Sequence, residues 1–199
     1  MRSHYHALIK KDVPNLNKKI WKLKAPLKVK IFLWYLRKGV ILTKDNLTKR
    51  NWQGSKSCCF CHKDESIKHL FFECRFARTV WAIFSCAAGI AAPINAFQMF
   101  DSWVQGLPST PQSIALLGAA AICWSIWLCR NDLVFEKKNV HSPLQVIFAA
   151  VRWVRTWVIL QSTEAQVLAM EASQLLTQVA MDIFSRAHGW RSSLRIEHL

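Results

Sequence analysis

Three cysteines and one histidine stand close together at the spacing C-x2-C-x7-H-x4-C. They are Cys58, Cys61, His69 and Cys74. Thiolate sulfur and imidazole nitrogen are the ligands that zinc prefers, and four of them complete the tetrahedral coordination of a structural site. Because no position is left for a water molecule, the pattern predicts a structural zinc ion and not a catalytic one.

A second pair with the same x2 spacing, Cys59 and His62, is shifted by one residue. We favour Cys58 and Cys61, because two thiolates neutralise more of the zinc charge than one thiolate and one imidazole. The spacing alone leaves both registers open. His69 and Cys74 are five residues apart, which on an ideal helix places them about 140° apart around the axis. We therefore expect His69 to lie at or before an irregular first turn.

The composition indicates a folded protein of a reducing compartment. The 199 residues are 52% hydrophobic, which is enough for one compact domain or two small ones. The seven cysteines are odd in number, and Cys86, Cys123 and Cys129 lie within apolar helical patterns, where we expect them to pack as small hydrophobic side chains. The first residues lack the apolar segment of a secretory signal, so we expect an intracellular protein of the nucleus or cytoplasm.

Positive charge is concentrated near the N-terminus. The formal net charge is +15, and residues 1–56 hold fifteen of the 27 lysines and arginines against only two acids, Asp12 and Asp45. Clustered cations favour a polyanionic partner, because contact with phosphates releases condensed counterions. The sequence therefore predicts binding to RNA or DNA. The expected phosphate contacts are Lys28, Lys30, Arg37, Lys38, Lys44, Lys49, Arg50 and Lys56.

Helical patterns surround the cysteine cluster. A helix is predicted over residues 26–38, with Pro26 in its first turn and Gly39 as its C-cap. Trp34 and Tyr35 are expected in its core-facing side. A second helix is predicted from Thr43, as N-cap, through Arg50.

A third helix is predicted from the N-cap Ser66 to the residues before Gly89. The aromatic side chains of its first turns are expected to pack on the helix that contains Trp34. They are Phe71, Phe72 and Phe76.

The C-terminal half is predicted to be an apolar bundle of helices over about 95–105, 112–137, 143–160 and 163–187. Residues 114–129 carry no charge, but they are shorter than the roughly 20 residues that span a bilayer, so we expect a buried core helix and no membrane association. Arg130 and Asn131 are expected to satisfy loop or helix-end groups.

The predicted fold class is all-α. A basic helical domain with a small zinc-knuckle insert is expected over residues 1–88, followed by the apolar helical region over 89–199.

Several spaced motifs in one order resemble a known family. They comprise Trp21, Pro26, Phe32 and Trp34, then Leu42 to Leu47 with Arg50 and Trp52, then Cys58, Cys61, Glu65, His69, Cys74 and Trp81. Residues 5–84 are similar to the reverse-transcriptase zinc-binding domain at the C-terminal end of plant LINE-type, non-LTR retrotransposon polyproteins. The W-x2-W-x2-R-N-x3-F segment over residues 124–135 resembles the segment that follows this domain. The resemblance implies zinc ligation by Cys58, Cys61, His69 and Cys74, and association with nucleic acid beside a polymerase partner.

Catalytic motifs of the parent polyproteins are not recognised in the sequence. A reverse transcriptase needs a Tyr-x-Asp-Asp type turn to hold metal ions, and the chain has none. The acids after residue 84 are scattered without a recognisable spacing. We therefore expect a non-catalytic module, with a protein-interaction module or an inactive retroelement remnant as the alternative. Oligomeric state does not follow from the sequence.

Overall fold

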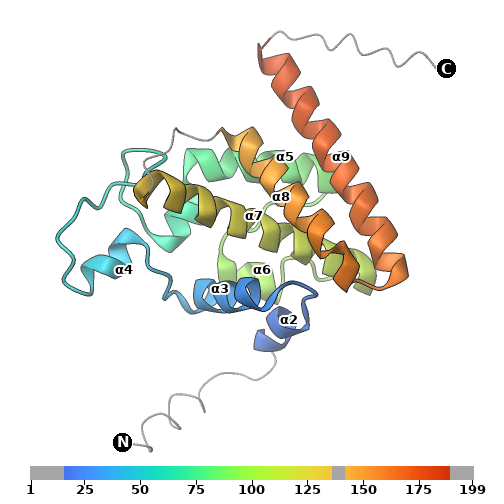
Figure 1. The fold of residues 1–199 in the computed structure, drawn as a ribbon, viewed down its shortest axis with the longest axis horizontal. Helices are drawn as coiled ribbons and strands as arrows, with labels where there is room; N and C mark the ends of the chain where they lie inside the picture. The colour runs from blue at the N-terminus through green and yellow to red at the C-terminus, as the bar shows by residue number, and fades with distance from the viewer. Residues whose placement is uncertain (1–15, 136–141, 189–199) are drawn as a thin grey trace, which may run out of the picture.

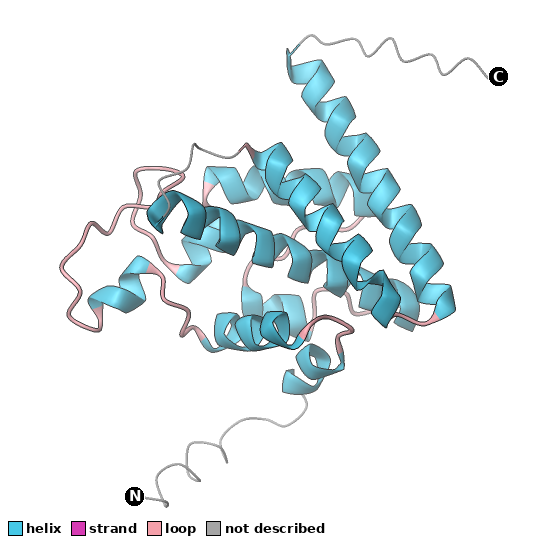
Figure 2. Cartoon of the chain, viewed as in Figure 1, coloured by secondary structure: helices cyan, strands magenta, loops and turns pink. Residues whose placement is uncertain are grey.

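The computed structural model describes residues 16–135 and 142–188, and these ranges form helices and loops with no named strand (Figure 2). The β pairing within them is a single bridge between Ser57 and Asp64. The all-α prediction is thus confirmed. The elements are α2 (Leu16–Lys22), α3 (Leu27–Lys38), α4 (Lys44–Thr48), the π-helical turn η1 (His69–Glu73), α5 (Arg75–Ala88), α6 (Ala96–Asp101), α7 (Ser109–Phe135), α8 (Pro143–Trp157), the 3-10 turn η2 (Val158–Leu160) and α9 (Thr163–His188).

Helix α7 lies at the centre of the molecule, with α8 and α5 packed against it and α9 along one end (Figure 1). Helices α3 and α6 lie together along another side, and α4 with its following loop lies at the end remote from α9. A helix that is apolar on all sides belongs in a core. Leu117, Ile122 and Ile126 of α7 are accordingly buried.

The hydrophobic core is continuous between the two regions that the sequence predicts. Helix α5, which ends at Ala88, packs on α7, α8 and α9. Buried residues from Ile20 to Ala180 belong to one cluster. The predicted division after residue 88 therefore separates helices that share one core, and the division into two domains stays a prediction.

The helix ends follow the capping residues closely. Helix α3 ends at Gly39, whose φ of 72° is the left-handed conformation that glycine adopts most easily. Ser142 begins α8 with a full capping box, in which its hydroxyl accepts from the Gln145 amide. Asn95 likewise caps α6 through the Gln98 amide.

Other boundaries differ from the predictions. The regular part of α4 ends at Thr48, because Lys49 and Arg50 form a closing turn in which the Trp52 amide donates to the Leu47 carbonyl. Helix α6 stops at Asp101, four residues before the predicted end. Helix α2 was not predicted. The predicted end of α7 at residues 136–137 lies outside the described residues.

Three predictions of burial were wrong in part. The Tyr35 side chain is 44% exposed and Trp34 is only partly buried. Cys86 is exposed, although Cys123 and Cys129 are buried as expected. Helical periodicity marks one face as apolar, but it does not state how far the neighbouring elements cover that face.

Two of the three aromatic side chains near the cysteine cluster also pack on other partners than predicted. Phe71 packs on α3 as predicted, with its ring 6.0 Å from that of Phe32. Phe72 instead stacks on Trp81, and Phe76 stacks on Phe60. Of the three predicted contacts with α3, only that of Phe71 is therefore observed as a contact between aromatic rings.

Two segments are long and apolar enough to cross a membrane by length and composition alone: Ser109–Phe135 and Pro143–Leu160. The most hydrophobic window of the first is 61% buried within the protein, and that of the second 33%. Core helices of soluble proteins pass the same test, so this finding is weak evidence for a membrane span.

The connection between α3 and α4 depends on the buried side chain of Asn46, whose amide donates to the carbonyls of Gly39 and Ile41, each at 2.8 Å. We expect Asn46→Ala to lower the free energy of unfolding by about 2 kcal/mol, because two carbonyls lose their donor. Urea unfolding measures this. The exposed Gln53→Ala serves as the control, with a change within about 0.5 kcal/mol, and equal effects of the two variants would contradict the assignment.

Candidate metal centre

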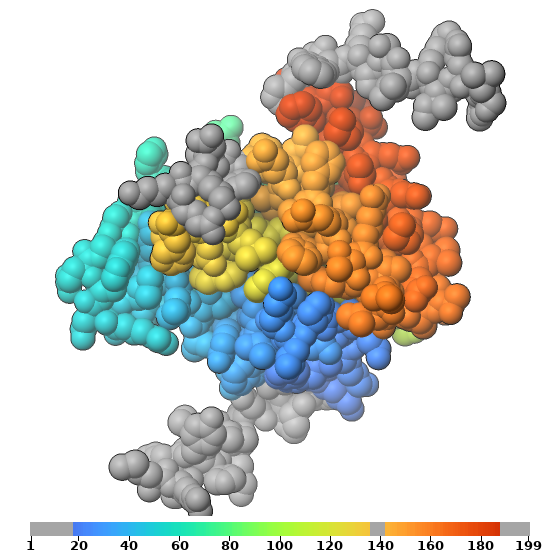
Figure 3. Space-filling model, in the orientation of Figure 1, coloured from blue at the N-terminus to red at the C-terminus, as the bar shows by residue number. Residues whose placement is uncertain are grey.

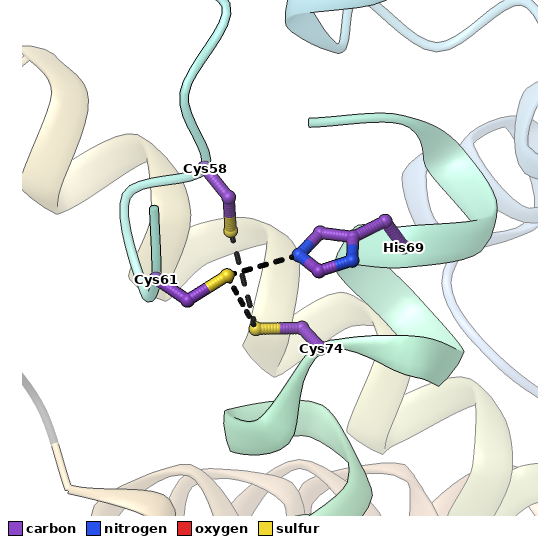
Figure 4. A group of neighbouring side chains, drawn as sticks. All are labelled: Cys58, Cys61, His69 and Cys74. Carbon is purple, nitrogen blue, oxygen red and sulfur yellow. Dashed lines mark hydrogen bonds between the residues drawn. The ribbon is translucent and has the colours of Figure 1, made fainter. Parts of the chain in front are cut away.

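Cys58, Cys61, His69 and Cys74 converge on one point (Figure 4). Their ligand atoms all lie within 4.8 Å of one another. The Sγ atom of Cys74 is 4.0 Å from that of Cys58 and 3.8 Å from that of Cys61, and Cys61 Sγ is 3.1 Å from His69 Nε2. These are the four residues predicted as zinc ligands.

The two sulfur separations that involve Cys74 fit a tetrahedral zinc ion. Zinc binds sulfur at roughly 2.3 Å, so two sulfurs on one tetrahedron lie about 3.8 Å apart. The two sulfur pairs have this separation, and the three sulfurs with one nitrogen are a donor set of structural zinc sites. Cys58, Cys74 and His69 are buried and Cys61 is partly buried, which leaves little access for a fifth, reactive ligand.

The first two ligands lie on a short hairpin loop. The Cys58 amide donates to the Lys63 carbonyl at 2.7 Å, and the Glu65 amide donates to the Lys56 carbonyl at 2.8 Å. Inside the loop, the Phe60 amide points at Cys58 Sγ at 3.4 Å. This hairpin, residues 56–65, is called the knuckle below.

The other two ligands are brought together by a π-helical turn. Ser66 accepts from the His69 amide, as predicted for the N-cap, and the Cys74 amide then donates to the His69 carbonyl at 2.7 Å. A bond between residues five apart widens the turn, so His69 and Cys74 return to the same side. The expected irregular first turn is confirmed. Cys74 then leaves the helical conformation, with ψ of 138°, before α5 begins.

The electrostatics of the cluster are suited to a bound cation. The neighbouring thiols of Cys59 and Cys74 lower the pKa of Cys58 well below its usual range, since they donate hydrogen bonds to its thiolate. The same contact with Cys58, with burial in addition, raises the pKa of both Cys59 and Cys74. Sulfurs this close carry several negative charges only with a positive ion between them.

The alternative ligand register receives no support from the geometry. His62 is exposed and is absent from the clusters found among the described residues. Cys59 lies near Cys58 and Glu65 instead. The arrangement therefore favours Cys58 and Cys61 as the ligand pair.

Aromatic side chains attach this centre to the core. The rings of Phe60, on the knuckle, and Phe76, on α5, are parallel within 4° at 4.2 Å. Phe71, on the π-helical turn, lies against Phe32 of α3 and Trp127 of α7. The metal centre thus has a hydrophobic backing from three helices.

A buried ion pair joins the knuckle to α7. Arg130 and Glu65 are 1% and 0% exposed in their side chains, and Arg130 Nη2 donates to Glu65 Oε1 at 2.9 Å. The same carboxylate oxygen accepts from the Lys44 amide at 2.9 Å, so Glu65 caps α4 in place of the Thr43 hydroxyl. The expectation that Arg130 satisfies a loop group is confirmed, but its partner was not predicted.

The predicted cations fall into two groups in the fold. Lys44 belongs to α4, Lys49 and Arg50 follow it in the segment that leads to the knuckle, and Lys56 is the first residue of the knuckle. The Lys44 ammonium donates to the Ser57 carbonyl at 2.5 Å, and Lys49 contacts Asn46. Arg50 and Lys56 are exposed.

The other four cations lie on different sides of α3. Lys28 lies over the rings of Trp124 and Trp153, at 5.9 and 5.7 Å. Lys30 donates to the Trp21 carbonyl, and Arg37 lies 5.6 Å from the Phe97 ring. Lys38 lies over Trp34 at 4.9 Å. Helix α3 therefore does not present its four cations on one face.

Comparison with known proteins agrees with this site. Residues 1–81 match the family described as zinc-binding in reverse transcriptase. A protein of Arabidopsis thaliana, provisionally named a ribonuclease H protein, is 29% identical over 87 residues, which cover 41% of this chain and 14% of the relative. The chain thus spans a small part of that protein's length. No solved structure gives a significant match. Residues 1–81 are therefore similar to the zinc-binding domain of reverse transcriptases, and this part of the predicted resemblance is confirmed.

We expect purified protein to contain one zinc ion per chain, and Cys58→Ser to lose it, because the tetrahedral site loses a ligand. Cys59→Ser is the matched control, since it removes the adjacent thiol and leaves the four converging residues intact. Metal analysis of both variants measures this. Loss of zinc in Cys59→Ser with retention in Cys58→Ser would favour the other register.

Arg130→Met is expected to lower the free energy of unfolding of the zinc-loaded chain by about 3–5 kcal/mol, because it leaves a buried carboxylate without its partner. The double variant Glu65→Gln and Arg130→Met should be more stable than Arg130→Met alone, since the buried charge is then removed as well. Denaturant unfolding of the unmodified chain, both single variants and the double variant completes the cycle. Strictly additive effects would contradict a direct interaction.

Proposed function

We propose that this chain is a non-catalytic module that binds RNA or DNA, in which a structural zinc ion fixes the knuckle and nearby cations contact phosphates. The observation that carries the proposal is the attachment of α4 to the knuckle. The Glu65 carboxylate caps α4, and the backbone carbonyl of Glu65 accepts from the Asp45 amide. The Lys44 ammonium donates to the Ser57 carbonyl. A metal ion in the knuckle would thereby set the position of α4 and of the cations that follow it, Lys49 and Arg50.

The charge of this region supports a polyanionic ligand. Lys49, Arg50 and Lys56 are exposed within a short segment, and Asp45, which precedes them in the sequence, is in contact with Lys49 at 3.9 Å. A surface ion pair of this kind contributes little to stability and leaves the lysine able to exchange partners. Phosphate contacts reward such clusters through counterion release.

The ligand set supports a structural role for the metal. All four converging groups are protein ligands, and a catalytic zinc ion needs a position open to water. The family that matches residues 1–81 is described by zinc binding and not by a catalytic activity of its own. We therefore infer that the module acts by binding and leaves polymerase chemistry to a partner domain.

The proposal predicts salt-dependent binding. A labelled single-stranded oligonucleotide, as RNA and as DNA of the same sequence, should bind the zinc-loaded chain with an affinity that falls as salt rises. The triple variant of Lys49→Gln, Arg50→Gln and Lys56→Gln should flatten the slope of log affinity against log salt by about one per cation. Fluorescence anisotropy measures both quantities.

A matched pair of single variants tests whether position matters. Arg50→Gln and Arg186→Gln remove the same charge from exposed side chains, the first beside the knuckle and the second near the end of α9. Only the first should weaken binding. Affinity that is absent at low salt, or that does not depend on salt, rejects the proposal and favours a protein-interaction module or an inactive remnant.

A further inference from the structure

A second group of cations lies outside the knuckle, where Lys28 of α3 approaches Trp153 of α8. Lys28, near the start of α3, has its ammonium 5.7 Å from the centroid of the Trp153 ring. The Arg152 guanidinium lies at the same distance of 5.7 Å from that ring. One indole of α8 thus contacts two cations that are more than a hundred residues apart in the sequence. Lys28, Arg152, Trp153 and Arg155 are called the Trp153 surface below.

The arginines of this surface border a hollow on α8. Phe148, Arg152, Arg155 and Thr156 line it from α8, and Thr177 lines it from α9, around a cavity volume of about 470 Å³. Residues three and four apart share one side of a helix, so both guanidinium groups lie on the same side. The hydroxyls of Thr156 and Thr177 donate to backbone carbonyls of their own helices. The guanidinium groups are therefore the principal hydrogen-bond donors of the hollow.

The positive charge of Lys28, Arg152 and Arg155 is not neutralised by any acid on α3 or α8. Neither α3 nor α8 contains an acidic residue. The indole nitrogens of Trp124 and Trp153, both in rings that Lys28 contacts, are buried donors with no acceptor within residues 16–135 and 142–188. Like charges three residues apart repel each other, and an anion between them would relieve that repulsion.

The surface is held in place by contacts outside it. The side-chain amide of Gln161, just after η2, donates to the Lys24 carbonyl at 2.7 Å, and so ties the segment before α3 to the end of α8. Figure 3 shows the surface of α3 meeting that of α8 on the face that also carries α4 and the loop after it. A long ligand could therefore contact both regions from one side.

We propose that the Trp153 surface is a second phosphodiester-binding site, at which Arg152, Arg155 and Lys28 contact the backbone of the same single-stranded nucleic acid that the knuckle region binds. This inference rests on the proposed function and extends the ligand's path onto the C-terminal helices. Arginine is suited to the task, because its planar guanidinium pairs with two phosphate oxygens at once. Trp153 positions the two flanking cations through their contacts with its ring.

The test is a salt titration of the full, zinc-loaded chain with the same RNA and DNA oligonucleotides. The double variant Arg152→Gln and Arg155→Gln should flatten the slope of log affinity against log salt by about two, one for each phosphate that no longer pairs with a guanidinium. The variant Arg152→Lys and Arg155→Lys keeps the charge and should keep the slope. Arg186→Gln, which removes a cation outside the surface, should leave both slope and affinity unchanged.

The outcomes separate the two proposals. If the unmodified chain binds with a salt dependence that the knuckle variants reduce but the glutamine double variant does not, the second site is overturned and the proposed function stands. If the unmodified chain does not bind, both are overturned. Thermal melting followed by circular dichroism accompanies each variant. If the double variant unfolds, the single variants Arg152→Gln and Arg155→Gln should each flatten the slope by about one, and an unchanged slope in both overturns the second site. A larger effect on RNA than on DNA would assign the site to RNA.

Discussion

The structure depends on the buried pair of Glu65 and Arg130. A carboxylate and a guanidinium removed from water are tolerated only when each satisfies the other and their remaining hydrogen-bonding groups are satisfied. Here Arg130 also donates to Asn131, and Glu65 accepts from the first amide of α4. The pair therefore fixes the relative position of three segments: the knuckle, α4 and the last turns of α7. It also makes the zinc-binding region dependent on a helix that follows it by many residues.

The metal centre and this ion pair have complementary roles. The knuckle is too short to bury a core of its own, so its conformation relies on two backbone hydrogen bonds, on the stacking of Phe60 on Phe76 and on the convergence of four residues suited to a metal ion. The π-helical turn allows two ligands five residues apart to approach the same point. The Glu65 carboxylate of this ion pair also accepts from the Lys44 amide, and so links the position of the knuckle to α4 and to the cations that follow it. A structural metal and a buried salt bridge together would make the cationic surface rigid, which lowers the entropy lost on binding.

The fold distributes the charge of the N-terminal segment more widely than its sequence suggests. The cations of α3 lie on opposite sides of the helix, because about 100° separates successive residues around the axis. Lys28 faces α7 and α8, whereas Lys30 contacts the end of α2 and Arg37 contacts α6. The same packing brings Lys28 to the Trp153 ring, which Arg152 also contacts, in a region with almost no net charge. A count of charge along the sequence therefore does not describe the distribution of charge around α3 or on the Trp153 surface.

The sequence by itself determined the features that depend on near neighbours, and only the tertiary structure decided which distant groups meet. The cysteine and histidine spacing predicted the four residues that converge, and Gly39, Asn95 and Ser142 predicted helix ends through local capping bonds. Glu65 and Arg130 are instead 65 residues apart, and no local pattern states that they will pair in the core. The exposure of Tyr35 and Cys86, and the meeting of Lys28 with Arg152 at Trp153, depend likewise on how helices pack. Packing is set by the complementary shape of whole faces and by the cost of leaving a buried charge without a partner, and neither is written in the spacing of residues along one helix.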